Sequence, residues 1–408
     1  GRWRRKHDDG RQVRKAAARE ERETKRGRFT ERAESNTLLF AETHMTDAVD
    51  EEFGVCPSTL HVLLPRENPL VVRQAAASWR SQPFLENPGV KALKTTWRIH
   101  PLGWNSVWEA DCCFLEASVG QFMEWEKSVG TLSSEGDNPF ARFNRNTHWA
   151  YADYKHVKEL GEEWAKALGH VVDWSVLGCD KAATDSTLWL GTEGSHTPLH
   201  YDTYGVNLVA QLQGRKKWLL YPPADTANLS PTRVPYEESS VFSRVDARAP
   251  DLTRFPQFAK AHALVVTLEP GDVLYVPNHW WHFVEAVETS LSVNVWLEAP
   301  GDQRDRASES VARVLMTSLA GELDEELGSG WLNPTEEAIW PLAETTAVAR
   351  VAFQGLNANT QGKANEDGGE HVATVDGGFS VRALVDAVMA PDVLQMIVER
   401  IARQRRDG

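Results

Sequence analysis

The chain has 408 residues, 41% of them hydrophobic, and a formal net charge of −14 at pH 7. Its length allows one large domain with additions, or two domains, and its negative charge argues against a protein that binds nucleic acid over its whole surface. No apolar run reaches the ~18 residues that a membrane span requires, so we expect no membrane contact.

In residues 1–44, basic side chains outnumber acidic ones and apolar residues show almost no periodicity. We predict that residues 1–54 form a disordered basic tail, because such a segment cannot bury enough apolar surface to fold. Two other interpretations are a translated leader upstream of Met45 and a nucleic-acid or targeting arm. No apolar stretch follows the basic residues, as it would in a secretory signal.

Residues 55–130 mix short strand and helix patterns. Residues 68–73 predict a strand entered through a proline turn. Residues 110–125 predict a strand followed by a helix that begins near Ser118. The four cysteines of the chain form no CxxC pair, which is typical of a reducing compartment, so we expect a cytoplasmic protein that is also present in the nucleus.

Residues 186–298 carry the densest strand signals, as short apolar or alternating runs separated by Gly, Pro and Asp. Many short antiparallel strands predict a sandwich or barrel, and metal-binding cupins belong to the double-sheet jelly rolls. We therefore predict a mainly β fold with flanking helices, with its barrel core at about 186–298. The polar, proline-bearing stretch 222–262 is expected to be too irregular for a sheet and to lie over the barrel mouth.

Beyond residue 300 the pattern becomes helical. Val311, Val314, Leu315 and Leu319 form one apolar stripe of a helical region at 301–354. Residues 355–378, rich in Gly, Asn and Asp, predict a linker. Residues 379–408 predict terminal helices with a second stripe, formed by Val381, Leu384, Val385 and Val388. We expect the stripes either to pack on the barrel or to form an interaction surface, such as a homodimer contact.

Two segments 80 residues apart carry the strongest functional signal. His200 and Asp202 lie two residues apart, so on a strand both side chains leave the same face. His282 arrives from a later strand-like run. Two imidazoles and one carboxylate form the facial triad of non-haem Fe(II) oxygenases. We predict that these three residues bind the metal, and that His196, His262 and His279 do not.

Such a metal needs a co-substrate that supplies electrons, and 2-oxoglutarate can chelate it. The distal carboxylate of 2-oxoglutarate then needs a cation and hydroxyl donors. Lys216 shares a strand face with Trp218 and Leu220, and a lysine on an apolar face must pair or snorkel. The alternative is a surface lysine beside its basic neighbours. Thr197 can add a hydroxyl bond.

Two asparagines lie on strands flanking the predicted metal ligands. Asn207 and Asn294 can hydrogen-bond the carboxylate next to the metal or a bound water. Either asparagine could instead cap the end of a strand.

The chain resembles the JmjC family of Fe(II)/2-oxoglutarate oxygenases over residues from about 60 to 340. The segments that carry the resemblance are WAYADY (149–154), STLW (186–189), HTP (196–198), HYDTYGVNL (200–208), QGRKKW (213–218), PYEESSVF (235–242), RFPQF (254–258), PNHWWH (277–282) and WLNPT (331–335). The stretch 237–240 marks a subgroup associated with a small heat-shock protein, but it has no evident chemical role.

The resemblance implies that 55–300 form a JmjC catalytic domain with a double-stranded β-helix. It places Fe(II) on the triad and the 2-oxoglutarate carboxylate on Lys216 and Thr197. A family tyrosine that also reaches this carboxylate would be Tyr151, with Tyr154 as the rival. The spacing from Asp202 to Asn207 is one residue longer than in a related asparaginyl hydroxylase.

The activity that the resemblance implies is oxidation of a protein or RNA substrate, with succinate and CO₂ released. Hydroxylation is favoured over histone demethylation, because the sequence has no zinc-finger cysteine pattern. The alternative function is a non-catalytic scaffold that binds a small heat-shock protein or another partner.

Overall fold

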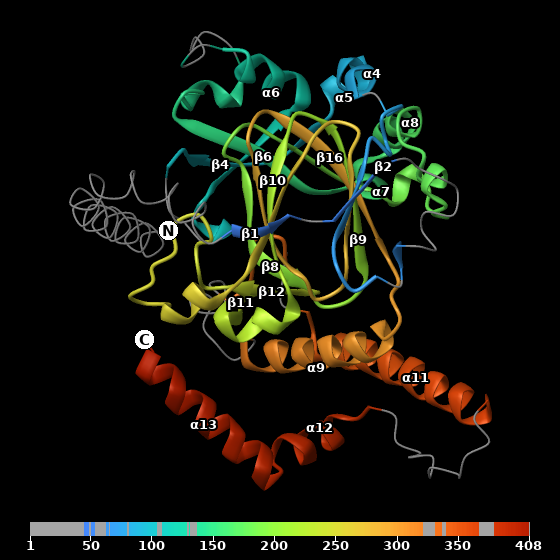
Figure 1. Ribbon diagram of the computed structural model, residues 1–408, viewed down its shortest axis with the longest axis vertical. Helices are drawn as coiled ribbons and strands as arrows, with labels where there is room; N and C mark the ends of the chain where they lie inside the picture. Colours follow the sequence, from blue (N-terminus) through green and yellow to red (C-terminus); the bar gives the residue numbers. More distant parts are fainter. Residues whose placement is uncertain are drawn as a thin grey trace, which may run out of the picture.

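The computed structural model describes residues 45–48, 50–53, 63–64, 66–79, 81–103, 108–128, 130, 137–320, 331–336, 340–366 and 379–407. Two sheets form a central barrel, and helices cover its ends and one flank (Figure 1). Within these residues, no helix is long and apolar enough to cross a membrane. Of the tail predicted at residues 1–54, residues 1–44 lie outside the described part of the chain.

The first sheet has, in the described residues, the strand order β1-β13-β10-β15-β8-β12-β11. Its strands are β1 (Met45–Ala48), β8 (His196–Asp202), β10 (Lys216–Tyr221), β11 (Pro231–Glu237), β12 (Ser240–Ser243), β13 (Ala263–Leu268) and β15 (Trp281–Ala286).

The second sheet has the order β2-β3-β14-β9-β16-β7-β6-β4-β5. Its strands are β2 (Asp50–Phe53), β3 (Leu70–Arg73), β4 (Lys94–Pro101), β5 (Cys113–Ser118), β6 (His148–His156), β7 (Thr187–Gly191), β9 (Val206–Gln213), β14 (Val273–Val276) and β16 (Ser290–Leu297).

The middle of each sheet confirms the predicted double-stranded β-helix. β7, β16, β9 and β14 are neighbours in one sheet, while β8, β15, β10 and β13 are neighbours in the other. From β7 to β10 and from β13 to β16 the chain alternates between the two sheets, as in a jelly roll, while β10 and β13 pair within one sheet. All eight strands lie within 187–297, which agrees with the predicted barrel core.

Strand alternation in β10 shows which side chains enter the barrel. Trp218 and Leu220 pack inside it, in a cluster with residues of both sheets. Leu219 and Tyr221 pack outside, against the connection after β10. Lys216 has the parity of Trp218 and is 2% exposed, so the predicted inward direction of this lysine is confirmed and the surface alternative is wrong.

The part of the chain before the barrel extends the second sheet and adds helices around a third, aromatic-rich core. Ser118 caps α6 with a capping box to Gln121, as expected from a serine at this boundary. The helices are α4 (Ser81–Glu86), α5 (Pro88–Ala92), α6 (Val119–Glu126), α7 (Val157–Leu160) and α8 (Glu162–Gly169). The short 3₁₀ segments are η1 (Glu109–Asp111), η2 (Pro139–Arg142), η3 (Trp174–Leu177), η4 (Ala183–Asp185), η5 (Pro223–Asn228) and η6 (Pro256–Lys260).

The C-terminal helices lie together beside one end of the barrel (Figure 1). They are α9 (Asp302–Ala320), α11 (Leu342–Glu366), α12 (Val381–Val388) and α13 (Pro391–Asp407). Val314 and Val311 of the first predicted stripe pack in the same cluster as Phe379 and Leu384. The two stripes therefore partly cover each other, while Leu319 stays 59% exposed.

Three sequence-based expectations are wrong in part. Residues 45–48 and 50–53, assigned to the tail, form β1 and β2, because they pair in parallel with strands that would otherwise be sheet edges. The stretch 222–262, expected to be irregular, contributes β11 and β12 to the first sheet. Residues 355–366 of the predicted linker continue α11, because a nucleated helix propagates at little cost; residues 367–378 lie outside the described part.

Candidate metal and co-substrate site

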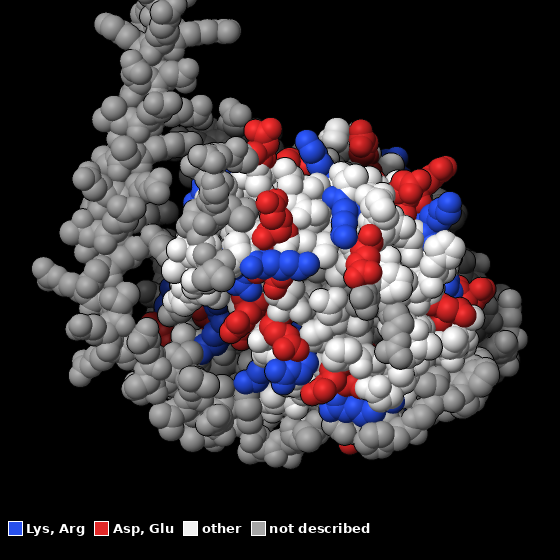
Figure 2. Space-filling view, turned by 90° about the horizontal axis from the view of Figure 1, so that it is seen from above, with Lys and Arg blue, Asp and Glu red and all other residues white. Residues whose placement is uncertain are grey.

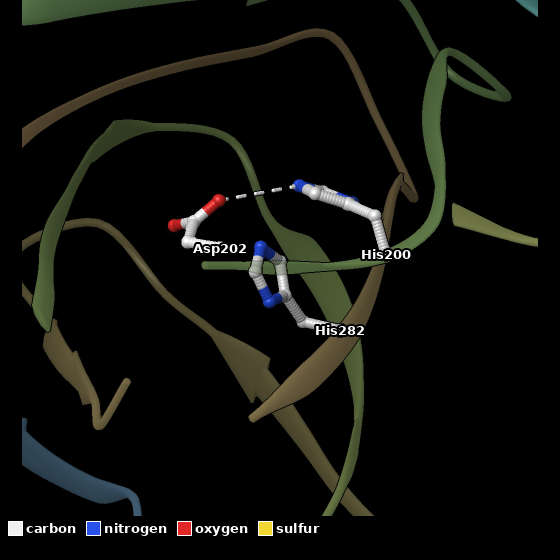
Figure 3. A group of neighbouring side chains, drawn as sticks. All are labelled: His200, Asp202 and His282. Atoms are coloured by element: carbon white, nitrogen blue, oxygen red, sulfur yellow. Dashed lines mark ion pairs between the residues drawn. The ribbon is translucent and has the colours of Figure 1, made fainter. Parts of the chain in front are cut away.

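The three predicted metal ligands meet inside the barrel. His200 and Asp202 lie at the end of β8, and His282 on β15 is the direct cross-strand partner of His200. One ligand atom from each residue lies within 4.8 Å of those of the other two. Figure 3 shows the three side chains around a common space. Among the described residues, no other group of histidine, cysteine and acidic side chains comes this close.

Both imidazoles are oriented by backbone carbonyls. His200 Nδ1 lies 2.8 Å from the carbonyl oxygen of Pro198, and His282 Nδ1 lies 2.9 Å from that of Trp280. Such contacts place the proton on Nδ1 and leave Nε2 to bind a metal. Burial, with a further contribution from His282, lowers the pKa of His200 to about 4, so this imidazole is neutral near pH 7.

The carboxylate of Asp202 is held from the other sheet. Trp296 Nε1 donates to Asp202 Oδ2 at 2.9 Å, while Oδ1 lies 3.8 Å from His200 Nε2. Two imidazoles and one oriented carboxylate are the donor set of a divalent iron site with open positions. The residues present therefore fit Fe(II).

Lys216 is a buried cation without a carboxylate partner at contact distance among the described residues. Its Nζ donates to Ser292 Oγ at 2.8 Å and to the Tyr151 hydroxyl at 3.3 Å. Burial lowers the pKa of Lys216 to about 7, and Asp153 opposes this shift only in part. An unpaired buried ammonium is costly, so this position favours an anionic ligand such as a carboxylate.

The two candidate tyrosines occupy different places. Tyr151 contacts Lys216 and also hydrogen-bonds the side chain of Thr197. Tyr154 instead packs its ring 4.7 Å from that of Trp189. The structure therefore brings Lys216, Thr197 and Tyr151 together.

The two asparagines bridge neighbouring strands of the second sheet. Asn294 Nδ2 donates to Asn207 Oδ1 at 2.8 Å, and Asn294 Oδ1 accepts from Trp189 Nε1 at 2.8 Å. Both side chains are almost fully buried. Neither caps a strand end.

One cavity of about 1060 Å³ contains all of these groups. Its lining includes the triad, Lys216, Thr197, Tyr151, Asn207 and Asn294, together with three tryptophans on the inner faces of the sheets, Trp189, Trp218 and Trp296. This volume lies at the upper end of the range for small-molecule sites. The cavity thus offers space for a co-substrate and part of a larger substrate.

The sequence analysis assigned no role to two members of this site. Ser292 binds Lys216 and Trp296 holds Asp202. Both share the parity of Asn294 on β16. Strand alternation from Asn294 would have indicated them.

Three further histidines of the described part, His196, His262 and His279, lie outside the metal cluster. His196 Nδ1 lies 3.0 Å from the carbonyl oxygen of Gly194. His279 Nε2 lies 2.9 Å from the carbonyl oxygen of Thr203. The side chain of His262 is 75% exposed.

A buried charge network in the wall of the same cavity was not anticipated. Arg98 forms ion pairs with Glu109 at 3.2 Å and with Asp153 at 2.6 Å. Burial raises the pKa of Glu109 to about 7 and that of Glu237 to about 8. Arg98 therefore pairs with two acids, Glu109 and Asp153, and Glu237 lies near enough to Glu109 for their charges to interact. The three acids are far apart in the sequence, so no local motif signals the network.

Comparison with known proteins agrees with this architecture. Residues 108–303 match the family described as "Cupin-like domain". The chain is 40% identical over 282 residues to HSPB1-associated protein 1 of Rattus norvegicus, covering 67% of this chain and 58% of that protein. The human protein of the same name is 45% identical over 230 residues, covering 56% of this chain and 46% of that protein.

A second group of relatives carries the JmjC name or a demethylase name. Jumonji C domain-containing protein 5 of Drosophila melanogaster is 40% identical over 116 residues, covering 28% of each chain. Lysine-specific demethylase 8 of Xenopus tropicalis is 34% identical over 149 residues, covering 35% of this chain and 31% of that protein.

The chain spans about half the length of HSPB1-associated protein 1. The β-helix, the triad and the matched segment all coincide in the same stretch of sequence. The chain therefore contains a cupin-like domain over residues 108–303 and is similar, over part of its length, to proteins that carry the JmjC name.

Proposed function

We propose that the protein is an Fe(II)- and 2-oxoglutarate-dependent dioxygenase that hydroxylates a protein substrate. The observation that carries this proposal is the combination, in one cavity, of the triad and the unpaired Lys216. When bound, Fe(II) supports the reaction of O₂ with 2-oxoglutarate, which yields succinate, CO₂ and a substrate C–H bond converted to C–OH.

In this proposal each residue of the chain has a definite task. His200, Asp202 and His282 hold the metal from one side and leave the other side open to the cavity. Lys216, with Thr197 and Tyr151, binds the distal carboxylate of the co-substrate. Asn207 and Asn294 supply side-chain amides that can hydrogen-bond a carboxylate or a water next to the metal. The tryptophans that line the cavity limit the access of water.

A protein substrate is favoured over RNA by the surface charge. Acidic and basic side chains are interspersed on the face shown in Figure 2, and its described residues form no continuous basic patch. RNA-binding proteins usually carry such a patch to meet the phosphates. The net charge of −14 points in the same direction.

A small heat-shock protein is the partner that the names of the relatives suggest, since several are called HSPB1-associated protein 1. We propose it as a partner of this chain as well, in the cytoplasm and the nucleus. A scaffold without catalysis would bind this partner but would not need Lys216 in the barrel.

The proposed activity predicts succinate formation that depends on Fe(II), 2-oxoglutarate and O₂. Purified protein should be incubated with peptides and RNA captured from cell extract, and the products examined by mass spectrometry. We expect one peptide to gain the mass of one oxygen atom. A mass gain on RNA would instead identify RNA as the substrate. Binding of a partner without succinate formation would support the alternative of a non-catalytic scaffold.

We further propose that two copies associate through the exposed end of α9. Leu315 and Leu319 are 38% and 59% exposed, and burying such surface contributes roughly 25 cal/mol per Å². Sedimentation should show a dimer that Leu319→Glu converts to a monomer. A wild-type chain that sediments as a monomer at micromolar concentration would contradict this.

A further inference from the structure

Two sequence segments that had no chemical role, 235–242 and 331–335, are joined in the structure. Tyr236 N donates to the carbonyl oxygen of Trp331 at 2.5 Å, and Asn333 N donates to that of Tyr236 at 2.8 Å. Tyr236 and Leu332 form a parallel β-bridge. Residues 331–336, here called the clasp segment, therefore lie along β11, the last strand of the first sheet.

Side chains lock this backbone pairing. Asn333 Nδ2 donates to Glu237 Oε2 at 2.5 Å and lies 3.1 Å from Glu109 Oε2. Thr335 Oγ1 donates to Glu237 Oε2 at 2.6 Å. Asn333 is 1% and Glu237 7% exposed. Buried amide and carboxylate groups are costly unless each finds a partner, so these residues stabilise the clasp segment as a set.

The clasp segment forms part of the cavity that contains the triad. Thr335 and Glu336 line it, as do Glu237 and Glu238 of β11. In the sheet order, β11 lies two strands from β8, which is roughly 10 Å. That separation is too large for a metal contact and suits the flanks of a bound substrate.

We propose that the clasp segment is the substrate-side wall of the active site, and that Asn333 is the positioning residue that fixes it on Glu237 and Glu109. This inference rests on the proposed oxygenase function. Because the family match ends at residue 303, this wall is an addition to the cupin-like domain. It determines which substrates reach the metal without altering the binding of metal or co-substrate.

Asn333→Ala tests whether the contacts of Asn333 with Glu237 and Glu109 hold the clasp segment on β11. Removing the amide leaves two carboxylates without their shared donor. The ratio of molecules with the clasp segment paired to β11 to those with it detached should therefore fall by roughly 5- to 100-fold. We expect hydrogen exchange at the amides of Tyr236, Glu238 and position 333 to accelerate by that factor, with β8 and β15 unchanged. Asn146→Ala, at an exposed asparagine, is the matched control. Unchanged exchange in Asn333→Ala would overturn the proposal.

A second measurement tests the wall. A bulky Fe(II) chelator should strip the metal from Asn333→Ala faster than from wild-type protein by a similar factor, while the affinity for 2-oxoglutarate stays the same. If hydrogen exchange is faster but the rate of Fe(II) removal is unchanged, the segment has only a structural role and the proposal is overturned. If Asn333→Ala does not fold, Thr335→Val should give the same changes on a smaller scale. Failure of the wild-type chain to bind Fe(II) would instead refute the oxygenase proposal, and the exchange result would still report on the lock.

Discussion

Replacing Asp202 with alanine is expected to abolish succinate formation and to weaken Fe(II) binding sharply. Asp202 is the one anionic member of the triad, and the change also removes the acceptor of the Trp296 N–H. Loss of an outer-sphere partner alone typically costs 10–100-fold in metal affinity, so we expect a loss of at least about 100-fold for a direct ligand. Anaerobic titration with Fe(II) measures the affinity.

Two variants make this result specific. His262→Ala removes an exposed imidazole outside the cluster and should leave affinity and turnover unchanged. Trp296→Phe keeps the carboxylate but removes its hydrogen bond, and we expect a weaker loss, within the 10–100-fold range of outer-sphere partners. Full activity of Asp202→Ala would place the metal elsewhere.

The triad could be anticipated because it depends on short-range geometry. The separation of His200 and Asp202 by two residues fixes both side chains on one face of β8, whatever the rest of the fold does. The same rule predicted the inward direction of Lys216. The sequence predicted His282 as a ligand from its place in a later strand-like run, and only its pairing opposite His200 needed the barrel itself.

The features that escaped prediction depend on long-range pairing. β1 and β2 have few apolar residues, and they are strands only because sheet edges accept their backbone groups. The contact of Asn333 with Glu237 joins residues 96 apart. No local pattern specifies such a contact, since each residue alone resembles an ordinary surface polar group.

Replacing Lys216 with methionine is expected to raise the 2-oxoglutarate concentration needed for turnover. Methionine keeps the unbranched shape but removes the charge that meets the co-substrate carboxylate. Truncating one member of a buried charge pair typically costs about 2–5 kcal/mol, roughly 30-fold or more in affinity. Fe(II) affinity should change little, because Lys216 contacts Ser292 and Tyr151 and not the triad. Titration of succinate formation against 2-oxoglutarate measures the shift.

Lys217→Met is the matched control, because Lys217 lies on the opposite face of β10, outside the cavity lining. The pH dependence adds an independent test. The pKa of Lys216 is lowered to about 7 by burial, and a bound carboxylate favours the charged amine, so binding above this pH requires proton uptake. Affinity should be full below pH 7 and should fall above it, by up to roughly tenfold per pH unit. Lys216→Met should lose this dependence along with the affinity; an unchanged titration curve would place Lys216 outside the co-substrate site.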